Sequence, residues 1–336
     1  EDFLKRLADP VWFQSLGCVL AFDWNASGLT TTTLGALKFA FRGLEKDLGI
    51  FICGGKGKTS RKTPDEIKNW GWRLSLDEEK VKRLIYSSRA AAKVDSSLVQ
   101  DGFQIYHHNF IFVKNGQWTG IQRGMDIEKG KARRHHWWGD EKKDFIDAPH
   151  CGIASQVFLK NVLDLTAPKS QKNREVGVEL VQSSKTLWRD LALLKSTQDD
   201  WQFKILKLPG GEFSHHPVER EFLNFESPQF KKALNQAVIN RPDNFEKLLM
   251  TKGVGPKTIR AISLVAEVIY AAKPSYEDPA RYTFAHGGKD GTPYPVNRKV
   301  YDESLAIIEK AIRQTSGLTL KEKSQASWRA EKALGN

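Results

Sequence analysis

Hydrophobic and polar positions at the start of the chain indicate alternating strands and helices. Residues 17–22 form an apolar run that predicts a buried strand, and residues 34–44 carry apolar side chains at helical spacing. Residues 50–53 predict a second buried strand. Because strand, helix and strand follow one another, we expect a right-handed crossover.

A β-hairpin is predicted in the middle of the chain. Residues 103–113 and 118–122 are rich in aromatic and β-branched side chains. Asn115 and Gly116 lie between them, and Asn-Gly between two such runs is the strongest short-range signal for a hairpin. The N-terminal part is therefore expected to be mixed α/β.

Helical spacing dominates after residue 150. It is present at 157–163, 174–182 and 184–194, and again from residue 228 apart from the polar segment 273–295. The last twenty residues lack apolar periodicity, so we expect a frayed tail. The predicted parts are a mixed α/β domain at 1–150, a helical connector at 151–227, an all-α domain at 228–316 and a polar tail at 317–336.

Composition and charge favour an anionic polymer as partner. The 336 residues include 52 Lys and Arg against 40 Asp and Glu, which gives a formal net charge of +12. We expect no membrane span, because no apolar run reaches 18 residues. Three widely separated cysteines, Cys18, Cys53 and Cys151, favour a reducing cytoplasmic location over a disulfide framework.

A turn near the C-terminal end suits a DNA backbone. Residues 242–250 predict a short helix, and Pro256 begins a second one. Two glycines between the helices permit positive φ and let backbone amides approach a phosphate closely. The expected DNA contacts are Lys252, Gly253, Gly255, Lys257 and Thr258. Such contacts bind the DNA backbone whatever its base sequence.

The segment 253–258, Gly-Val-Gly-Pro-Lys-Thr, resembles the helix-hairpin-helix family of DNA-repair proteins over about thirty residues. The resemblance implies non-specific DNA binding. DNA glycosylases that carry this hairpin also have a catalytic Asp in a Val-Asp pair, whereas this chain has Asn297 in the nearest similar segment. Because an amide cannot stabilise a cationic intermediate as a carboxylate does, a glycosylase is the third alternative.

A glycine-rich loop follows the strand predicted at 50–53. Its Gly-Lys-Thr at 57–59 is typical of a nucleotide-binding loop, but Ile52 occupies the position where that pattern needs a glycine. We therefore expect no nucleotide cofactor. The loop still suits a nucleic-acid phosphate, with a plain solvated turn as the alternative. Its expected DNA contacts are Lys56, Lys58 and Arg61.

Candidate catalytic residues lie in the N-terminal half. Asp23 follows the first predicted strand, where a carboxylate can hold Mg²⁺ or Mn²⁺ or orient water. His107 and His108 are neighbours in a strand and point to opposite faces, so one of them is the expected general base. Gln122, across the hairpin, and His136 complete the candidate catalytic set.

A basic run at 129–138 ends in two tryptophans. Arg133 and Arg134 can stabilise phosphate charge, and Trp137 and Trp138 can stack on the bases of single-stranded or distorted DNA. Core tryptophans after a charged turn are the alternative.

Five segments resemble the prokaryotic domain of unknown function 763 family across nearly the whole chain. They are Phe22-Asp23-Trp24, 53–57, 122–125, Ala132-Arg133-Arg134 and 284–291. The resemblance directs attention to 284–291, which composition alone assigns to a loop, and makes Lys289 a further candidate DNA contact.

We therefore expect a deoxyribonuclease in which the α/β domain hydrolyses phosphodiester bonds and the C-terminal helices hold DNA. The alternative is a non-catalytic DNA-binding or repair-scaffold protein. A divalent metal ion is an expected cofactor, and the sequence gives no oligomeric state.

Overall fold

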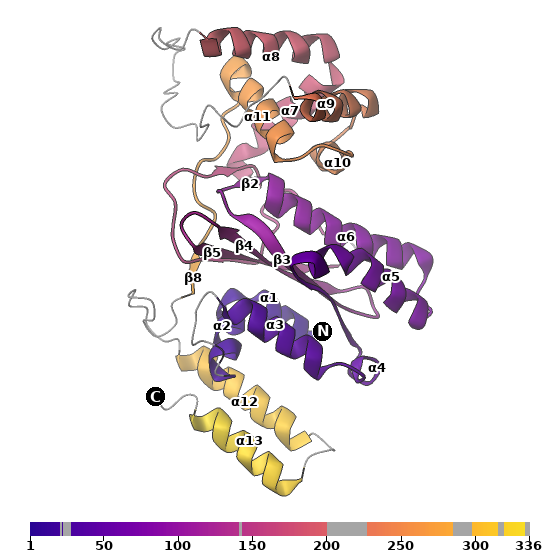
Figure 1. Ribbon diagram of the computed structural model, residues 1–336, viewed down its shortest axis with the longest axis vertical. Coiled ribbons are helices and arrows are strands. Elements are labelled where there is room, and N and C mark those ends of the chain that lie inside the picture. Colours follow the sequence, from indigo (N-terminus) through magenta and orange to yellow (C-terminus); the bar gives the residue numbers. More distant parts are fainter. Residues whose placement is uncertain are drawn as a thin grey trace.

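A six-stranded, mostly antiparallel sheet forms the centre of the molecule (Figure 1). The computed structural model describes residues 1–20, 22, 28–140, 143–199, 227–284, 298–314 and 319–332. In sheet order, the strands are β1 (Ile50–Lys56), β3 (Gln104–Val113), β4 (Trp118–Asp126), β5 (Lys131–Gly139), β6 (Gly152–Ser155) and β8 (Tyr282–Thr283). The pair β6 and β8 is parallel, whereas the other neighbours are antiparallel.

The predicted hairpin is confirmed and the predicted crossover is wrong. Strands β3 and β4 pair around Gly116, whose φ of 96° is the left-handed conformation that glycine favours. Strand β1 pairs antiparallel with β3, so it takes part in no parallel strand-helix-strand unit.

Helices cover both faces of the sheet (Figure 1). One face packs against α5 (Thr63–Arg73) and α6 (Glu78–Ser97), which enclose alternate apolar residues such as Phe51 and Phe110. The other face packs against α1 (Asp2–Ala8), α2 (Pro10–Val19) and α3 (Leu29–Ala40), which enclose Ile52 and Ile111. A short helix α4 (Glu45–Leu48) precedes β1, and a 3-10 helix η1 (Gly57–Lys62) follows it. The mixed α/β class is therefore confirmed.

The strand predicted at 17–22 is wrong, because residues 17–19 form the last turn of α2 and Leu20 ends that helix. Asp9 caps that helix by accepting hydrogen bonds from the amides of Val11 and Trp12, and Pro10 occupies its first turn. Most of α2 is buried, so its apolar residues form a continuous run that carries no helical period.

Beyond β6, the chain builds a layer of helices against one end of the sheet. These are α7 (Gln171–Gln182), α8 (Ser184–Asp199), α9 (Pro228–Asn240), α10 (Phe245–Met250) and α11 (Pro256–Tyr270), with the short η2 (Pro168–Ser170) before α7. Their buried residues share one core with α6 and the sheet. The helix predicted at 157–163 is wrong: this segment leads into β7 (Leu163–Asp164), which pairs with β2 (Val99–Gln100).

The last described helices correct the expectation of a frayed tail. Helix α12 (Arg298–Gln314) packs against α2, and α13 (Leu320–Lys332) lies beside α12 (Figure 1). Thr319 and Glu322 cap α13 reciprocally, because each accepts a hydrogen bond from the backbone amide of the other. A local cap therefore starts a helix that the apolar pattern did not reveal.

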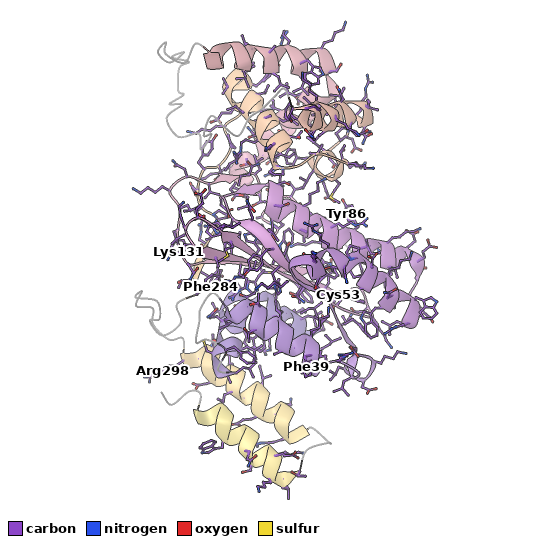
Figure 2. All side chains as sticks on the ribbon, viewed as in Figure 1. Phe39, Cys53, Tyr86, Lys131, Phe284 and Arg298 are labelled. Carbon is purple, nitrogen blue, oxygen red and sulfur yellow. The ribbon has the colours of Figure 1, made fainter. Side chains whose placement is uncertain are left out.

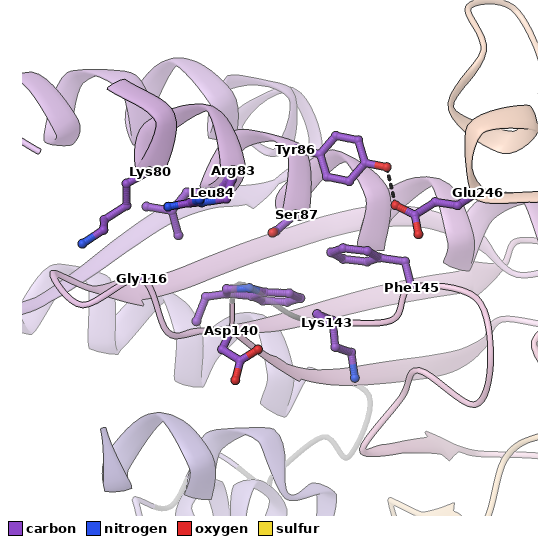
Figure 3. Close-up of a pocket in the computed structure, with 11 residues that line it drawn as sticks. Lys80, Arg83, Leu84, Tyr86, Ser87, Gly116, Asp140, Lys143, Phe145 and Glu246 are labelled. Atoms are coloured by element: carbon purple, nitrogen blue, oxygen red, sulfur yellow. Dashed lines mark hydrogen bonds between the residues drawn. The ribbon is translucent and has the colours of Figure 1, made fainter. Parts of the chain in front are cut away.

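Side chains fill the spaces between these layers (Figure 2). A hollow of about 170 Å³ lies between α6 and the neighbouring ends of β4 and β5, close to the start of α10 (Figure 3).

Candidate functional site

A row of basic side chains crosses the sheet on the face covered by α1, α2 and α3. Lys56 of β1 pairs with His107 of β3. His107 in turn pairs with Arg123 of β4, and Arg123 pairs with Arg134 of β5. We call these four residues the cationic row. It runs from Lys56, exposed at the edge strand, to Arg134, which is fully buried.

A β-bulge shapes the row where it enters the sheet. The register of β3 and β4 shifts between Ile105 and His107, so Tyr106 has no partner in β4. The Tyr106 ring lies 6.0 Å from Lys56 Nζ and 5.5 Å from the guanidinium of Arg123. One aromatic ring therefore contacts two neighbouring cations of the row.

Arg134 is surrounded by neutral groups. Its Nε donates to His136 Nε2 at 2.6 Å, and its Nη1 donates to Gln14 Oε1 and Thr30 Oγ1, both at 3.2 Å. Phe13 and Phe284 lie 4.5 and 5.0 Å from the guanidinium. These contacts fix its orientation, and none of them comes from a carboxylate.

Neither Arg123 nor Arg134 pairs with a carboxylate in the described part of the chain. The buried Nε of Arg123 also lacks a hydrogen-bond partner there. Burial, together with repulsion from Arg123, lowers the pKa of Arg134 to about 9. A buried charge without a counter-ion costs several kcal/mol, so two neighbouring guanidinium groups with no carboxylate partner among the described residues favour binding of an anion.

The two histidines on this face are neutral, with different free nitrogens. His107 Nε2–H donates to Asn109 Oδ1, which leaves the buried Nδ1 without a partner among the described residues. His136 Nδ1–H donates to the Leu7 carbonyl at 3.0 Å, and its Nε2 accepts from Arg134. His107 can therefore accept a proton, whereas both nitrogens of His136 are occupied.

Electrostatics keep both rings uncharged near neutral pH. Burial, with the charges of Arg123 and Lys56 nearby, lowers the pKa of His107 to about 4. Burial and the charge of Arg134 hold the pKa of His136 well below its usual value. His136 is thus a positioning residue for Arg134, which corrects its expected catalytic role.

The glycine-rich end of β1 forms the exposed rim of the row. A Cβ at Gly54 would lie 2.1 Å from the His108 carbonyl oxygen, so only glycine lets β1 approach β3 here. Glu66 accepts hydrogen bonds from Gly54 N and from Lys38, which fixes the strand end. The exposed cations of this rim are Lys56, Lys58 and Arg61.

A second polar cluster lies on the opposite face, under α6. The register partners His108, Gln122 and His135 form a row there. Gln122 therefore lies on the other side of the sheet from His107, which corrects the expectation that both serve one site. His108 bonds Ser88 at 2.8 Å, and burial lowers its pKa to about 4.

Asp95 of α6 is the centre of this second cluster. Its fully buried carboxylate accepts hydrogen bonds from Gln122 Nε2, Trp137 Nε1 and His150 Nε2 at 2.6 to 3.2 Å. His135 Nδ1 lies 3.0 Å away, outside hydrogen-bond alignment. Burial opposes ionisation, but the two imidazoles outweigh it and hold the pKa of Asp95 below its usual range.

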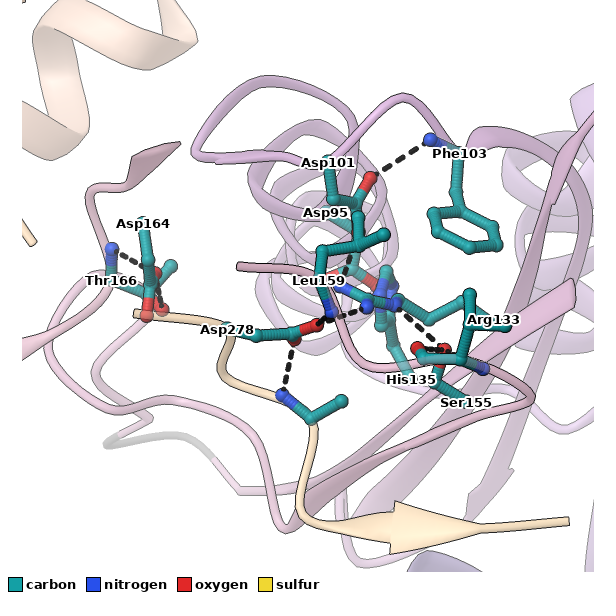
Figure 4. Close-up of polar contacts among 12 residues, drawn as sticks. Asp95, Asp101, Phe103, Arg133, His135, Ser155, Leu159, Asp164, Thr166 and Asp278 are labelled. Carbon is teal, nitrogen blue, oxygen red and sulfur yellow. Dashed lines mark hydrogen bonds and ion pairs between the residues drawn. The ribbon is translucent and has the colours of Figure 1, made fainter. Parts of the chain in front are cut away.

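Arg133 lies in a buried ion-pair cluster. It is fully buried and pairs with Asp101 and Asp278, each at 2.7 Å (Figure 4). Asp278 also accepts from the amide of Leu159, so the ion pairs join the chain after α11 to the sheet. The guanidinium of Arg133, an expected DNA contact, is therefore occupied by two carboxylates and is not presented to solvent.

The turn between α10 and α11 presents an open basic surface. Gly253 has φ of 88°, and a Cβ at Gly255 would meet no atom within 4 Å. Helix α11 begins without a side-chain cap, with exposed Lys252 and Lys257 on either side. Thr258 is an expected DNA contact, but it is buried, so its hydroxyl is not presented to solvent.

Two predicted residues, Asp23 and Lys289, lie outside the described residues. Sequence reasoning missed Asp95, because an Asp within a helix carries no local signal. No group of three or more metal-ligating side chains that could hold an ion occurs in the described ranges. No described helix is long and apolar enough to cross a membrane.

Comparison with known families gives one match. The family model described as "Protein of unknown function (DUF763)" matches residues 1–296. No curated protein and no solved structure matches the chain.

Proposed function

The chain belongs to the DUF763 family of proteins of unknown function, and we propose that it is a DNA-binding deoxyribonuclease. In this proposal, the cationic row binds the phosphate that is cleaved. An all-α C-terminal domain holds the DNA backbone through a helix-hairpin-helix formed by α10 and α11.

The observation that carries the proposal is the pair of adjacent arginines without a carboxylate partner in the described part of the chain. Arg guanidinium groups match the geometry of phosphate oxygens, and a dry surrounding strengthens that attraction. The row reaches the exposed sheet edge at Lys56, so a phosphate can enter from the rim of Lys58 and Arg61.

His107 is the proposed general base. Its Nδ1, which has no partner among the described residues, belongs to a neutral ring next to Arg123. Water attacks phosphorus as His107 takes its proton, the bond from phosphorus to the leaving oxygen breaks, and that oxygen takes a proton from solvent water, to which His107 later releases its own. Mg²⁺ or Mn²⁺ with Asp23 as a ligand stays part of the proposal.

The test is cleavage of plasmid and single-stranded DNA by the purified protein with Mg²⁺, with Mn²⁺ and with a chelator. Arg123→Gln and His107→Asn should each lower the cleavage rate at least about 100-fold, the size expected for lost charge stabilisation or lost acid–base catalysis. Lys56→Gln should weaken cleavage, and Lys68→Gln, an exposed lysine on α5, serves as its matched control.

The rival function is a non-catalytic DNA-binding protein. It is favoured by the burial of His107, since a buried base needs a path for water. DNA binding without cleavage under every metal condition would establish the rival and remove the nuclease.

A further inference from the structure

An open groove lies at the edge of the sheet formed by β1, which pairs with β3 alone among the described strands. Its volume is about 530 Å³, within the roughly 300–1,000 Å³ of pockets that hold small organic ligands. Ile52 of β1 lies between the two walls of the groove. One wall comes from α3 and the residues that follow it, and the other comes from α5. The groove is therefore large enough for a ligand of nucleotide size.

Two side chains block the addition of a further strand to β1. The amide of Gly54 donates to Glu66 at 3.0 Å, and its carbonyl accepts from Lys38 at 2.8 Å. Lys38 and Glu66 also pair with each other at 2.7 Å. Edge strands are commonly protected by side chains against pairing with another chain. A peptide strand or a second copy of this chain therefore cannot pair along β1 without breaking these bonds.

Cations without a carboxylate partner border the groove. Arg42 and Arg73 are exposed, and neither forms an ion pair in the described part of the chain. The two carboxylates that line the groove are engaged, Glu66 with Lys38 and Glu45 with a backbone amide at 2.8 Å. The walls therefore carry an excess of positive charge that attracts an anion, and guanidinium groups match the geometry of phosphate oxygens.

The groove also offers surfaces on which a planar ring can stack. Phe39 is 77% exposed, so its ring is open to solvent (Figure 2). Trp70 packs on Phe51, with ring centroids 5.0 Å apart, and the guanidinium of Arg73 lies 5.2 Å from the centroid of the Trp70 ring. Nucleobases stack on aromatic rings and on guanidinium planes. Phe39 and Arg73 therefore combine stacking surface with positive charge in one groove.

A glycine in α3 keeps the groove wide. Gly35 lies inside this helix, where glycine is less stable than alanine. A Cβ at Gly35 would meet no atom within 4 Å, so packing does not require the glycine. The residue is exposed and lines the groove. Close approach of a ligand to α3 accounts for a glycine that the fold does not need.

We propose that this groove binds single-stranded DNA, with a base stacked on Phe39 and phosphates held by Arg42 and Arg73. The proposal rests on the proposed DNA binding and names the DNA structure that the protein selects. A duplex keeps its bases stacked inside, so only an unpaired base can reach the ring.

The groove and the cationic row lie along the same strand. Lys56 follows Ile52 by four positions in β1, which is about 13 Å at the usual rise of a strand. That length corresponds to about four stacked bases. A single strand held in the groove therefore reaches the exposed end of the cationic row.

Fluorescence anisotropy with three probes of equal length tests the proposal: a single strand of thymidines, a single strand of abasic residues, and a duplex. Wild-type protein should bind the thymidine strand roughly tenfold more tightly than the abasic strand. Phe39→Ala should remove that preference. Phe158→Ala is the matched control and should retain it, because Phe158 is 58% exposed but lies beyond β6, outside the groove.

Variants of Gly35 separate binding from folding. Gly35→Leu should raise the thermal unfolding temperature, because leucine favours a helix, and weaken the thymidine strand at least about tenfold, because its side chain enters the groove. Gly35→Ala should also raise the unfolding temperature and retain most of the affinity. Arg42→Gln with Arg73→Gln should reduce the salt dependence of binding, by a slope of about 0.7 for each lost phosphate contact.

The outcomes separate the two proposals. Equal binding of thymidine and abasic strands by wild-type protein, or a preference that survives in Phe39→Ala, overturns the groove and leaves DNA binding intact. Absence of binding to every probe overturns both. A dimer in sedimentation that Phe39→Ala dissociates would identify a second copy as the occupant and would also overturn the groove. Lys252→Gln with Lys257→Gln should weaken all three probes alike, because that turn holds the backbone.

Discussion

At the scale of single residues, the cationic row lowers the stability of the fold and, in our proposal, serves to bind an anion. Arg123 and Arg134 are neighbours across the β4 and β5 pairing, and burial together with the repulsion between them lowers the pKa of Arg134. A folded protein gains nothing from two buried charges that lack a carboxylate partner, as these two do among the described residues. Their placement is understandable when an anion completes the site, as many functional sites are locally unfavourable without their ligand.

Replacing one of these charges by an apolar side chain of similar length should therefore not harm the fold. We expect Arg123→Met to raise the free energy of unfolding by roughly 1 kcal/mol, because it removes burial cost and repulsion. Urea unfolding measures this change. Adding phosphate should stabilise the wild type and leave the variant unaffected. A loss of 2 kcal/mol or more would show that Arg123 is paired in solution.

The buried histidines predict loss of stability in mild acid. His107 and His108 have pKa values of about 4 in the fold against about 6.5 when unfolded. Between these values the unfolded chain binds more protons, so the free energy of unfolding falls as pH decreases from 6.5 towards 4, by roughly 3 kcal/mol for each ring.

Chemical unfolding at several pH values checks this dependence. His108→Gln should flatten the curve. Ser88→Ala removes the hydrogen bond to His108 without removing the titrating group, so it should lower stability and keep the slope. An equal slope in His108→Gln and wild type would contradict the assignment.

At the scale of elements, the turn between α10 and α11 separates a folding requirement from a binding requirement. Gly253 needs its positive φ for the turn itself. Gly255 has an extended φ of −151°, and its Cβ would meet open space, so the fold does not require glycine there.

Gly255→Ala is therefore a sharp test of close approach by a phosphate. We expect a change of less than about 0.5 kcal/mol in stability, since the site is open and unstrained. Affinity for DNA should fall for every base sequence alike, because a methyl group would keep the backbone amides away from the phosphate. Unchanged affinity by fluorescence anisotropy would remove this turn from the DNA interface.

Local signals account for what could be predicted about the elements. Asn115 and Gly116 gave the hairpin, because a tight turn is encoded by adjacent residues. Helix α2 was mistaken for a strand, since a helix buried almost all round lacks the polar stripe that reveals its period. The start of α13 depends on the reciprocal cap between Thr319 and Glu322, and the pattern of apolar residues does not reveal such a cap.

The candidate site was only partly predictable for a different reason. Alternation along β3 correctly placed His107 and His108 on opposite faces. Assigning Gln122 and His136 to one site needed the register of three strands, and that depends on contacts between residues far apart in the chain. The burial of Arg133 depends on Asp278, which is separated from it by 145 positions.

At the scale of the whole molecule, the chain returns to the sheet after its helical layer. Strand β8 pairs with β6, and Asp278 pairs with Arg133 just before it. The helices α7 to α11 are thereby tied at both ends to the sheet and share its core. We expect sheet and helical layer to unfold together.

Breaking the tie should weaken the entire structure. Asp278→Asn leaves Arg133 with Asp101 as its remaining carboxylate, and we expect a loss of about 3 kcal/mol, the usual result when one partner of a buried ion pair is removed. Lys169→Gln, which breaks the exposed pair with Glu277, should cost less than about 1 kcal/mol. Calorimetry should detect one transition in each variant. Two transitions in Asp278→Asn would mean that the helical layer folds independently.

The cationic row and the cluster around Asp95 lie on opposite faces of the sheet and share the strands β3, β4 and β5. In β5, Arg133 and His135 face α6, while Arg134 and His136 face α1 to α3. In an ordinary surface strand, substitutions on the solvent-facing side leave stability nearly unchanged. Both sides of β5 are buried over these four positions, so it has no such side. Inserting or deleting one residue there would exchange the contents of the two clusters. Such a strand can drift very little in evolution, and its four-residue polar segment should persist in relatives whose surrounding helices have changed.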